Sequence, residues 1–529
     1  MYRTAKMPRI LLTCCFLLTL MAGTVWAAPD LSNNEASHKP ERNADGTYVL
    51  REAPELFWFA EAVNGGDTEL NAVLEADIDL ESQDFTPIGN EEQGYSGCFD
   101  GNGHEISGLS VNKEDNYAGL FGYVYFGTVK DLSVSGTVTG NSFVGGVAGK
   151  NYCGAIENCL SACAVAGNNQ VGGITGMNES RTSASCVTGC LSVGLVTGTR
   201  SVGGIVGQNT HTASIGGAYV ENCRNTGEVN GNYSNILGEL VGGVVGYNYA
   251  SLGLCTIAGC SNSGSVQGYI NVGGVTGRNF AYEGTANVTQ CYNTGTVSSM
   301  SIFKDEAIGG VAGSCNGIIG HSAQITECYS TGDVTGTAKN VGALVGKLTG
   351  ANSTNNRGSG YAKVIRSYCL IDGEVNTDRE VIGFIGTGAS ADEWTFSLTK
   401  NQFGEWESFH DWDAKVWHIR NHLSPAFSPV TARPTILAMD EPAAQVNMSW
   451  LSADTQSAKI SVCSELDAIV WLAAYGTEGQ FLAAQSAEIT GGENPALTFD
   501  VAPGAKILKA FAVDSCFVPL CADISTQLQ

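Results

Sequence analysis

The stretch Val144-Gly-Gly-Val-Ala-Gly149 decides the fold, because the chain repeats it many times. The same phrase returns as Val171-Gly-Gly-Ile-Thr-Gly176 and Val202-Gly-Gly-Ile-Val-Gly207, begins again at Val241, Val272, Ile308 and Val341, and occurs in eroded form at Tyr117 and Val381. Successive copies start 27, 27, 31, 39, 31, 36, 33 and 40 residues apart. A period in this range indicates a solenoid, in which each unit buries its apolar face against its neighbours.

The order of residues within the phrase predicts which side chains face the core. The fourth position is large and apolar in all nine copies, and neighbouring residues of a strand point to opposite faces. We therefore expect the fourth position to face the core and the fifth to face outward. The sixth position is always glycine, which predicts a positive φ or a close backbone approach at a corner. The apolar fifth-position residues, which form the predicted interaction face, are Phe121, Val206, Val245, Val345 and Ile385.

A second phrase alternates with the first and has the form apolar-x-x-Cys-x-x-x-Gly-x-Val, as in Val220-Glu-Asn-Cys223-Arg-Asn-Thr-Gly227-Glu-Val229. Short strands bounded by Gly, Asn or Thr describe one coil of a parallel β-helix. The cysteines at the shared position are Cys159, Cys190, Cys223, Cys260, Cys291, Cys328 and Cys369.

Stacked in register, these cysteines would lie one coil apart with their side chains pointing the same way, which is poor geometry for disulfides. We therefore predict a structural ladder of reduced thiols that pack as small apolar groups, and hence a reducing or anaerobic habitat. Two alternatives remain. Exported proteins can normally form disulfides. The cysteines could also bind zinc, although the chain has no Cys-x-x-Cys pair.

The N-terminal region predicts a signal peptide, a leader and a helix that caps the first coil. Residues 1–27 combine a basic start, a short apolar run and a cleavage site near Ala27, which is typical of a secretory signal peptide. Residues 28–47 are polar and predict a flexible leader. The stretch from Glu52 to Gly66 has Pro54 early, apolar residues at helical spacing and a Gly-Gly stop. We expect it to be a helix that caps the first coil, where open strand edges would otherwise invite aggregation.

Composition narrows the classes of partner. The chain has 27 basic and 52 acidic residues, a net charge of −25, which disfavours binding to nucleic acid or to an anionic membrane. After the signal peptide no apolar run is long enough to span a membrane. We therefore predict an exported protein, either secreted or held at the cell surface, with no nucleic-acid partner and no membrane span in the mature chain.

The repeats resemble a known family. Gly119-Leu-Phe-Gly122 matches the four-residue signature of the GLUG-motif repeat, and the lead-in Phe99-Asp-Gly-Asn-Gly-His104 is also typical of such proteins. The resemblance covers residues 48–423 and implies a β-helical, exported, adhesin-like bacterial protein. Some relatives carry a zinc peptidase domain, but this chain lacks His-Glu-x-x-His, so that activity does not carry over.

The rest of the chain predicts a second unit. Three prolines within Leu423–Thr435 indicate a linker at residues 424–435. In residues 436–529 the glycine phrase is gone and short strand-like runs alternate with turns, which predicts a small β-sandwich. The aromatic residues that could line a sugar platform or pack its core are Trp450, Trp471, Tyr475 and Phe481.

Two clusters could suggest chemistry, but we assign neither. Asp100, His104 and Glu105 lie close in sequence, yet turn formation accounts for Asp100, and the adjacent His104 and Glu105 would point to opposite faces of a strand. His418 and His422 could share a face near His410, but a zinc site needs a third ligand held in place. We therefore predict no catalytic residue, no metal site and no cofactor.

The leading functional hypothesis is a non-catalytic, adhesin-like β-solenoid that binds a host or carbohydrate partner through the fifth-position face. Charge added at Val206 and Val245 would then abolish binding without unfolding the protein. A polysaccharide lyase or hydrolase is one alternative, by analogy of fold only. A structural stalk that presents the C-terminal unit is another.

The thiol ladder predicts how the cysteines react. Few thiols should be titratable in the native protein, and many more should appear in denaturant, because the ladder cysteines are reduced and buried. Thiol titration with and without denaturant measures this. If no additional thiols appear on unfolding, the ladder is not reduced.

Overall fold

We describe a computed structural model of the chain. It covers residues 38–403 apart from 232–238, 300–305, 319–320, 338, 351–359, 372–375 and 377–378. Beyond residue 403 it covers 408–409, 412, 417–418, 426–427, 446–453, 457–464, 468–475, 481–489, 496–501, 503, 505–513 and 524–527. The predicted signal peptide, and the predicted leader up to residue 37, lie outside these ranges.

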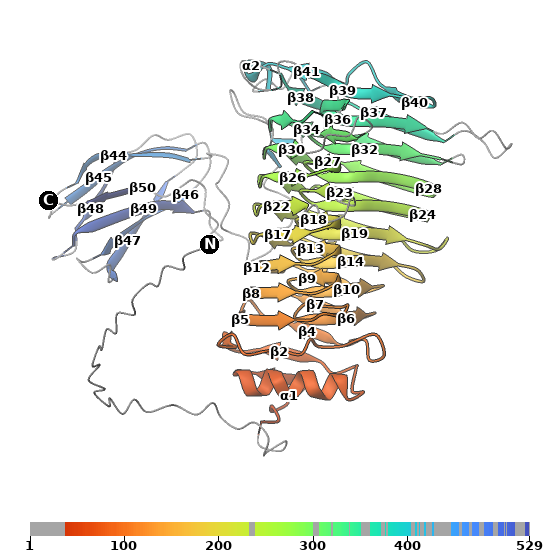
Figure 1. The fold of residues 1–529 in the computed structure, drawn as a ribbon. Helices are drawn as coiled ribbons and strands as arrows, with labels where there is room; N and C mark the ends of the chain where they lie inside the picture. The colour runs from red at the N-terminus through yellow and green to blue at the C-terminus, as the bar shows by residue number, and fades with distance from the viewer. Residues whose placement is uncertain are drawn as a thin grey trace, which may run out of the picture.

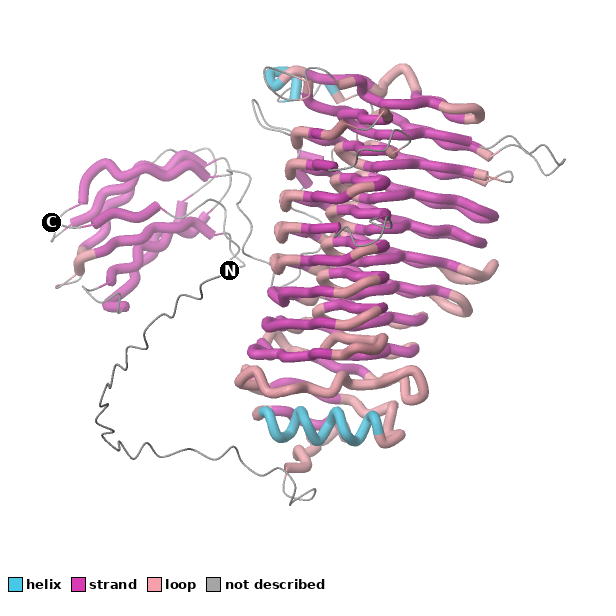
Figure 2. Tube along the Cα trace, viewed as in Figure 1, coloured by secondary structure: helices cyan, strands magenta, loops and turns pink. Residues whose placement is uncertain are grey.

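The repeats stack as coils of parallel strands (Figures 1 and 2). Every strand pairing between β1 and β41 is parallel and joins one coil to the next; β10 (Ala148–Tyr152), for example, pairs with β6 (Phe121–Tyr125) on one side and β14 (Thr175–Ser180) on the other. The coils share a 25-stranded and a 16-stranded sheet. These long parallel sheets are consistent with the predicted β-helix.

Each glycine phrase forms a corner between two strands of the first sheet. The strands that lead into the corner are β9 (Ser142–Gly145), β13 (Asn169–Gly172), β18 (Arg200–Gly203), β23 (Glu239–Gly242), β27 (Ile270–Gly273) and β31 (Ala307–Gly309). The strands that follow it are β6, β10, β14, β19 (Val206–His211), β24 (Val245–Ala258), β28 (Thr276–Thr289) and β32 (Ala312–Gly317), while β36 (Asn340–Gly350) and β39 (Glu380–Ile385) run through the phrase.

The remaining strands complete the coils. Those of the first sheet are β1 (Tyr48–Leu50), β2 (Ala72–Leu74), β4 (Cys98–Asp100), β7 (Thr128–Lys130), β11 (Ala155–Glu157), β15 (Ser185–Thr188), β20 (Ala218–Glu221), β33 (Ser322–Thr326), β37 (Tyr361–Ile365) and β40 (Ala389–Ala391). Those of the second sheet are β3 (Ile78–Asp79), β5 (Glu105–Asn112), β8 (Ser133–Thr139), β12 (Leu160–Ala166), β16 (Leu191–Ser192), β17 (Val196–Gly198), β21 (Arg224–Asn225), β22 (Val229–Gly231), β25 (Ser261–Asn262), β26 (Val266–Gly268), β29 (Tyr292–Asn293), β30 (Val297–Ser299), β34 (Tyr329–Ser330), β35 (Val334–Thr335), β38 (Tyr368–Leu370) and β41 (Phe396–Leu398).

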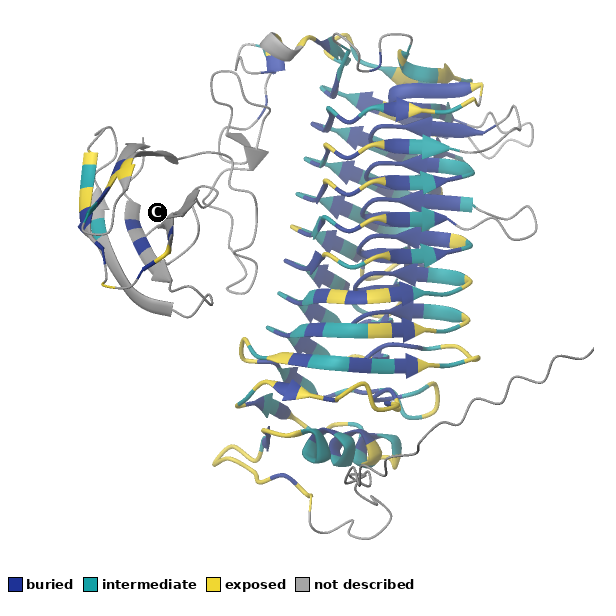
Figure 3. Cartoon of the chain, turned by 60° about the vertical axis from the view of Figure 1, so that its left-hand side comes forward, coloured by how far each residue is buried: buried dark blue, intermediate teal, exposed yellow. Residues whose placement is uncertain are grey.

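Much of the stacked array is buried (Figure 3). Fourth-position residues lie in this core, as predicted. They are fully buried in eight of the nine copies: Leu120, Val147, Ile174, Ile205, Val244, Val275, Val311 and Leu344. The glycines between coils allow close approach rather than a positive φ. A Cβ on Gly207 would lie 2.5 Å from the Val171 nitrogen and 2.6 Å from the Gly176 oxygen, so any larger residue would push the coils apart.

The predicted outward direction of the fifth position is wrong. Phe121, Val206, Val245 and Val345 are all fully buried. Alternation of side chains holds within a strand, but the corner interrupts the phrase at positions three and four: β9 ends at Gly145 and β10 begins at Ala148. Position four thus lies in the corner and position five begins the next strand, and the side chains of both are buried in the core.

Ile385, the fifth member of that predicted face, is half exposed for a different reason. The last copy of the phrase pairs in another register, with Ile382 opposite Val345 and Phe384 opposite Lys347, after an irregularity in β36. Phe384 was expected in the core, but this register places it on the outer surface, where it is 40% exposed.

Buried asparagines run from coil to coil through the interior. Asn151, Asn178, Asn209, Asn248 and Asn279 each pass a side-chain amide hydrogen bond to the next, at 2.8–2.9 Å, and Asn279 donates to the Cys315 sulfur at 3.6 Å. A second ladder joins Asn225, Asn262 and Asn293 in the same way and ends at Ser330. Buried amides are tolerated here because their neighbours satisfy them.

The structure places six of the predicted ladder cysteines one above the next. The backbone N–H groups of Cys190, Cys223, Cys260 and Cys291 each donate to the sulfur of the next ladder cysteine at 3.4 Å. The thiols donate to backbone carbonyls, such as that of Cys223 to Glu221 at 3.2 Å. Among the described cysteines every thiol is free.

Cys369 does not belong to the ladder, contrary to prediction. It pairs with Ser330, and Ser367 stands in the ladder position instead, where its hydroxyl accepts the N–H of Cys328 at 3.1 Å. The phrase in this coil is led by Val364, which pairs with Ile325, and not by Arg366. The sequence alignment of this copy was therefore displaced by two residues.

Helix α1 (Ala53–Asn64) lies at the first-coil end of the stack (Figure 1). It begins with Pro54 in its first turn and buries Leu56, Phe59, Ala60 and Val63. The Phe59 ring packs edge-on against Tyr95 and Phe99, with centroids 6.0 and 5.8 Å apart. The helix predicted between Glu52 and Gly66 is present, and its apolar side faces the core.

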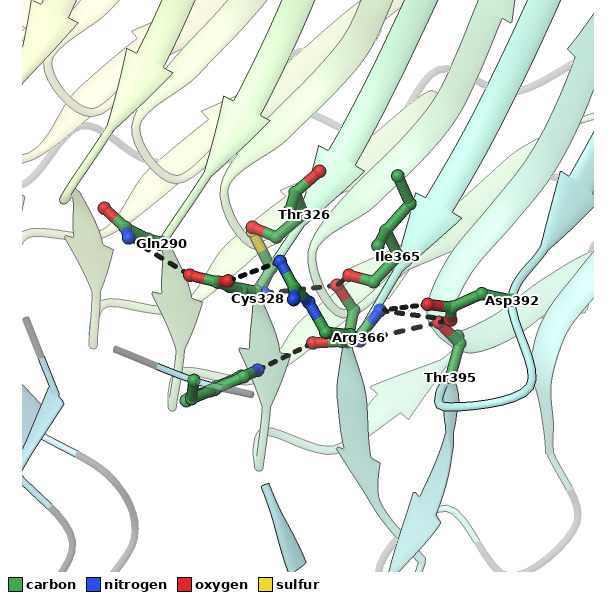
Figure 4. Close-up of polar contacts among 10 residues, drawn as sticks. Gln290, Thr326, Cys328, Ile365, Arg366, Asp392 and Thr395 are labelled. Carbon is green, nitrogen blue, oxygen red and sulfur yellow. Dashed lines mark hydrogen bonds and ion pairs between the residues drawn. The ribbon is translucent and has the colours of Figure 1, made fainter. Parts of the chain in front are cut away.

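At the other end, Arg366 joins three segments (Figure 4). Its guanidinium pairs with Glu327 at 2.8 Å, and its backbone N–H donates to both carboxylate oxygens of Asp392 at 3.1 Å. Its carbonyl accepts the indole N–H of Trp412 at 2.8 Å. An apolar cluster beside it consists of Tyr329, Tyr368, Leu398, Phe403, Phe409 and Trp412, with Phe403 ending α2 (Lys400–Phe403). Within the predicted linker, β43 (Ala426–Phe427) pairs with β42 (Trp417–His418).

The C-terminal unit contains two antiparallel sheets. One has the order β44 (Val446–Ala453), β45 (Ser457–Ser464), β48 (Ala496–Asp500). The other has the order β47 (Phe481–Ile489), β46 (Ala468–Tyr475), β49 (Ile507–Val513), β50 (Ile524–Gln527). The five predicted strand runs are present. The side chains of Trp450, Trp471, Tyr475 and Phe481 lie outside the described part of the structure.

The buried fifth position predicts the outcome of adding charge there. Val245→Asp should destabilise the solenoid by about 4 kcal/mol or more, because it buries an unpaired carboxylate. Val193→Asp is the matched control, since Val193 is 41% exposed and its substitution should change stability by about 0.5 kcal/mol or less. Thermal and denaturant unfolding measure both. Equal effects of the two substitutions would contradict the buried position of Val245.

Candidate functional site

The strands that follow each corner align two columns of side chains, most of which are exposed or half-buried, whereas Thr210, Ser314 and Asn316 are buried. In β10, Lys150 and Tyr152 point outward while Asn151 between them is buried. Register then defines the columns. The first is Tyr123, Lys150, Met177, Gln208, Tyr247, Arg278, Ser314, Lys347 and Phe384; the second is Tyr125, Tyr152, Glu179, Thr210, Tyr249, Phe280, Asn316 and Thr349. We call these two columns the outer face.

Aromatic rings gather at the N-terminal end of the outer face. Tyr125 and Tyr152 stack with centroids 5.3 Å apart and planes at 13°. Phe126 packs edge-on against Tyr125, and both are more than 40% exposed. Beside them Tyr117 stacks on Phe143 at 5.0 Å. We call this group, which also contains Tyr123, the N-terminal aromatic cluster.

Lys150 lies within this cluster. Its Nζ is 5.3, 5.7 and 5.4 Å from the ring centroids of Tyr123, Phe143 and Tyr152, and it pairs with Glu179 at 2.8 Å. Burial, with a smaller contribution from the charge of Glu179, raises the pKa of Tyr123 well above its ordinary value. Its phenol therefore stays neutral and can both donate and accept a hydrogen bond.

A second group of rings, the C-terminal aromatic cluster, lies three coils further along. Tyr247 and Tyr249 stack at 5.2 Å, and Tyr249 and Phe280 at 5.6 Å, in both cases with planes at 10°. The Arg278 guanidinium carbon lies 4.2 Å from the Phe280 ring centroid. Because coils are about 4.8 Å apart, Tyr152 and Tyr249 are separated by about 14 Å along the stack. Flat rings held on paired strands provide a rigid surface for stacking.

The candidate catalytic trio does not form a site. Asp100 pairs with Lys130 and accepts the backbone N–H of Asn102, as expected for a turn. His104 Nδ1 lies 3.0 Å from Asp77, whereas Glu105 accepts the hydroxyl of Ser135 at 2.6 Å. The backbone N–H of Glu105 and then His104 lower the pKa of Asp77. The members of the trio thus have separate partners.

Most of the histidine cluster near the end of the array lies outside the described residues. His410 and His422 lie outside the described residues, and only the backbone of His418 is described, in β42. Among the described residues no group of three or more His, Cys, Asp and Glu side chains could hold a metal ion. No helix in the same part of the chain is long and apolar enough to cross a membrane.

The sequence analysis missed the outer face, although its signal is present. Apart from Phe384, which comes from the copy with the shifted register, the members of the two columns are the first and third residues after the sixth-position glycine, as in Gly149-Lys150-Asn151-Tyr152. Alternation within the strand sends these two residues to the face opposite that of the buried residue between them. The repeated Asn at the second residue after the glycine marks the inward direction.

The fold defines the class of protein as a β-solenoid built of parallel coils. Residues 238–267 match the family described as "The GLUG motif", so the chain carries the repeat that its sequence resembles. No curated protein matches the chain in sequence.

Solved structures offer distant likenesses. One is a putative immunoglobulin A1 protease from Bacteroides ovatus, at 16% identity and a TM-score of 0.36 over 74% of this chain and 94% of that one. Another is the enzymatically active domain of tailspike protein 4 of Bacteriophage CBA120, at 9% identity and a TM-score of 0.24 over 85% of this chain and 62% of that one.

Proposed function

We propose that this protein is an exported, adhesin-like β-helix that binds carbohydrate, without catalysis, through the outer face. The observation that carries the proposal is the pair of stacked aromatic clusters, with Tyr125 and Phe126 each more than 40% exposed. Exposed rings that already stack on one another lose little conformational entropy when a sugar ring packs on them. Contiguous exposed aromatic surface of this kind is typical of a binding site.

The chemistry of the outer face favours binding over catalysis. Glycoside hydrolysis normally requires two carboxyl groups that flank the bond to be cleaved. Within the two columns the single carboxylate is Glu179, and it is paired with Lys150 at 2.8 Å. Neutral phenols and amides, which hydrogen-bond to sugar hydroxyls, make up much of the rest. We therefore assign the interaction to the outer face instead of the fifth-position residues, which are mostly buried.

The remaining parts support an exported repeat protein. We infer that α1 acts as a cap, because its buried residues cover the edge of the first coil. We infer that the two C-terminal antiparallel sheets pack as a β-sandwich and that residues 1–27 direct export. A stalk that presents the C-terminal unit is the second candidate, and in that case ligand binding would not depend on the outer face.

A glycan array, followed by calorimetric titration of the glycans it selects, tests the proposal. The double variant Tyr125→Ala, Tyr152→Ala should bind at least about tenfold more weakly than the natural chain, because it loses two stacking rings. Both rings are at the surface, so unfolding should be unchanged. Tyr361→Ala is the control, since Tyr361 is 50% exposed but belongs to β37.

Two results would refute carbohydrate binding by this face. One is that the natural chain binds no glycan. The other is that the double variant binds as well as the Tyr361→Ala control, which would move the site elsewhere in the chain.

A further inference from the structure

Two cations of the outer face have no acidic partner among the described residues. Arg278 and Lys347 stand in the same column, two coils and hence about 10 Å apart. Arg278 donates from Nε to Asn316 at 2.9 Å, and its guanidinium lies against the rings of Phe280 and Tyr247. These contacts fix the plane of the guanidinium and leave its terminal nitrogens available to an anion. Lys347 lies 5.9 Å from the ring centroid of Phe384.

Lys150, unlike Arg278 and Lys347, has an acidic partner among the described residues. Lys150 is neutralised by Glu179. From Gln208 onward the two columns hold Arg278 and Lys347 but no carboxylate, in a chain with 52 acidic and only 27 basic residues. This part of the outer face is therefore a local positive strip on a strongly acidic protein. Salt screens interactions beyond about 8 Å at physiological ionic strength, so the strip can attract an anion at short range despite the net charge.

The arrangement favours a long ligand that lies along the stack. Rings and cations follow one another in the order Tyr152, Tyr249, Phe280, Lys347, which spans about six coils, or roughly 29 Å. A small sugar could contact only one part of this run. A linear chain could occupy several parts at once and gain affinity from their linkage. Arg278 lies beside the C-terminal aromatic cluster, so a sugar that stacks there would bring its charged substituent close to the guanidinium.

We propose that the ligand is an acidic, linear glycan whose carboxylate or sulfate groups pair with Arg278 and Lys347 while its sugar rings stack on the aromatic clusters. This inference rests on the proposed carbohydrate binding and specifies its class of ligand. A guanidinium held in a fixed plane suits two-pronged pairing with a carboxylate or sulfate.

Matched polymers test the charge requirement. Polygalacturonate and its fully methyl-esterified form have the same backbone and differ in charge, and dextran sulfate and dextran form a second pair for sulfate. The full-length protein should bind the acidic member of at least one pair at least about tenfold more tightly than the neutral member, and this preference should shrink as salt is raised.

Substitutions of positively charged residues test whether Arg278 and Lys347 bind the acidic polymer. Arg278→Gln with Lys347→Gln should weaken binding of the acidic polymer about tenfold or more, because two charge-assisted contacts are lost. Lys363→Gln removes one exposed positive charge from β37 and should change binding less than about twofold. Circular dichroism and thermal unfolding should be the same for all three proteins, since these side chains lie at the surface.

The outcomes separate this inference from the proposed function. Equal binding of the acidic and neutral members of both pairs, or equal effects of the Arg278/Lys347 and Lys363 variants, overturns the acidic ligand. In that case the proposed function is judged separately: if the Tyr125→Ala, Tyr152→Ala variant loses glycan binding, carbohydrate binding by the outer face stands. Absence of binding to any glycan overturns both.

Discussion

Hydrogen bonding between identical buried side chains of successive coils is the interaction on which the rest of this structure depends. A buried asparagine amide that lacked partners would cost about 1–3 kcal/mol, so each amide of the ladder requires its counterpart one coil away. Asn178 illustrates this: it accepts from Asn151 at 2.9 Å and donates to Asn209 at 2.8 Å. A slip of one residue between coils would turn the amides outward and break the ladder. The ladders therefore fix register as well as contribute stability.

Register in turn creates the outer face. Because successive coils repeat the alternation seen around Asn151, the residues on either side of this buried position line up in columns. Tyr152 and Tyr125 come from different coils, 27 residues apart in sequence, yet they stack because β10 and β6 pair in register. A surface built in this way is long, straight and rigid. It suits a ligand that is itself extended, and coil-by-coil substitutions can change its chemistry without altering the core.

Much of the fold could be predicted from the sequence, because repetition amplifies weak local signals. The period indicated a solenoid, the fourth-position aliphatics marked the core, and the spacing around Cys223 brought six cysteines into one column. Errors arose where a local rule was carried across an irregularity. Alternation fails across a corner, which hid the burial of Val206, and a displaced alignment placed Cys369 two residues from its true position. The outer face was missed because its residues vary between coils, whereas the buried asparagine between its two columns recurs in five successive coils.

Amide hydrogen–deuterium exchange in strands β10, β14 and β19 tests the ladder most directly, by comparing two asparagines of the same coil. Asn178 is buried in the ladder, whereas Asn168 makes an equivalent 2.9 Å bond to Asn141 at the exposed surface. Asn178→Ala should accelerate exchange in these strands at least tenfold, because it leaves the Asn209 oxygen without a donor from the ladder, and Asn168→Ala should leave exchange nearly unchanged. Equal exchange in the two variants would contradict the account.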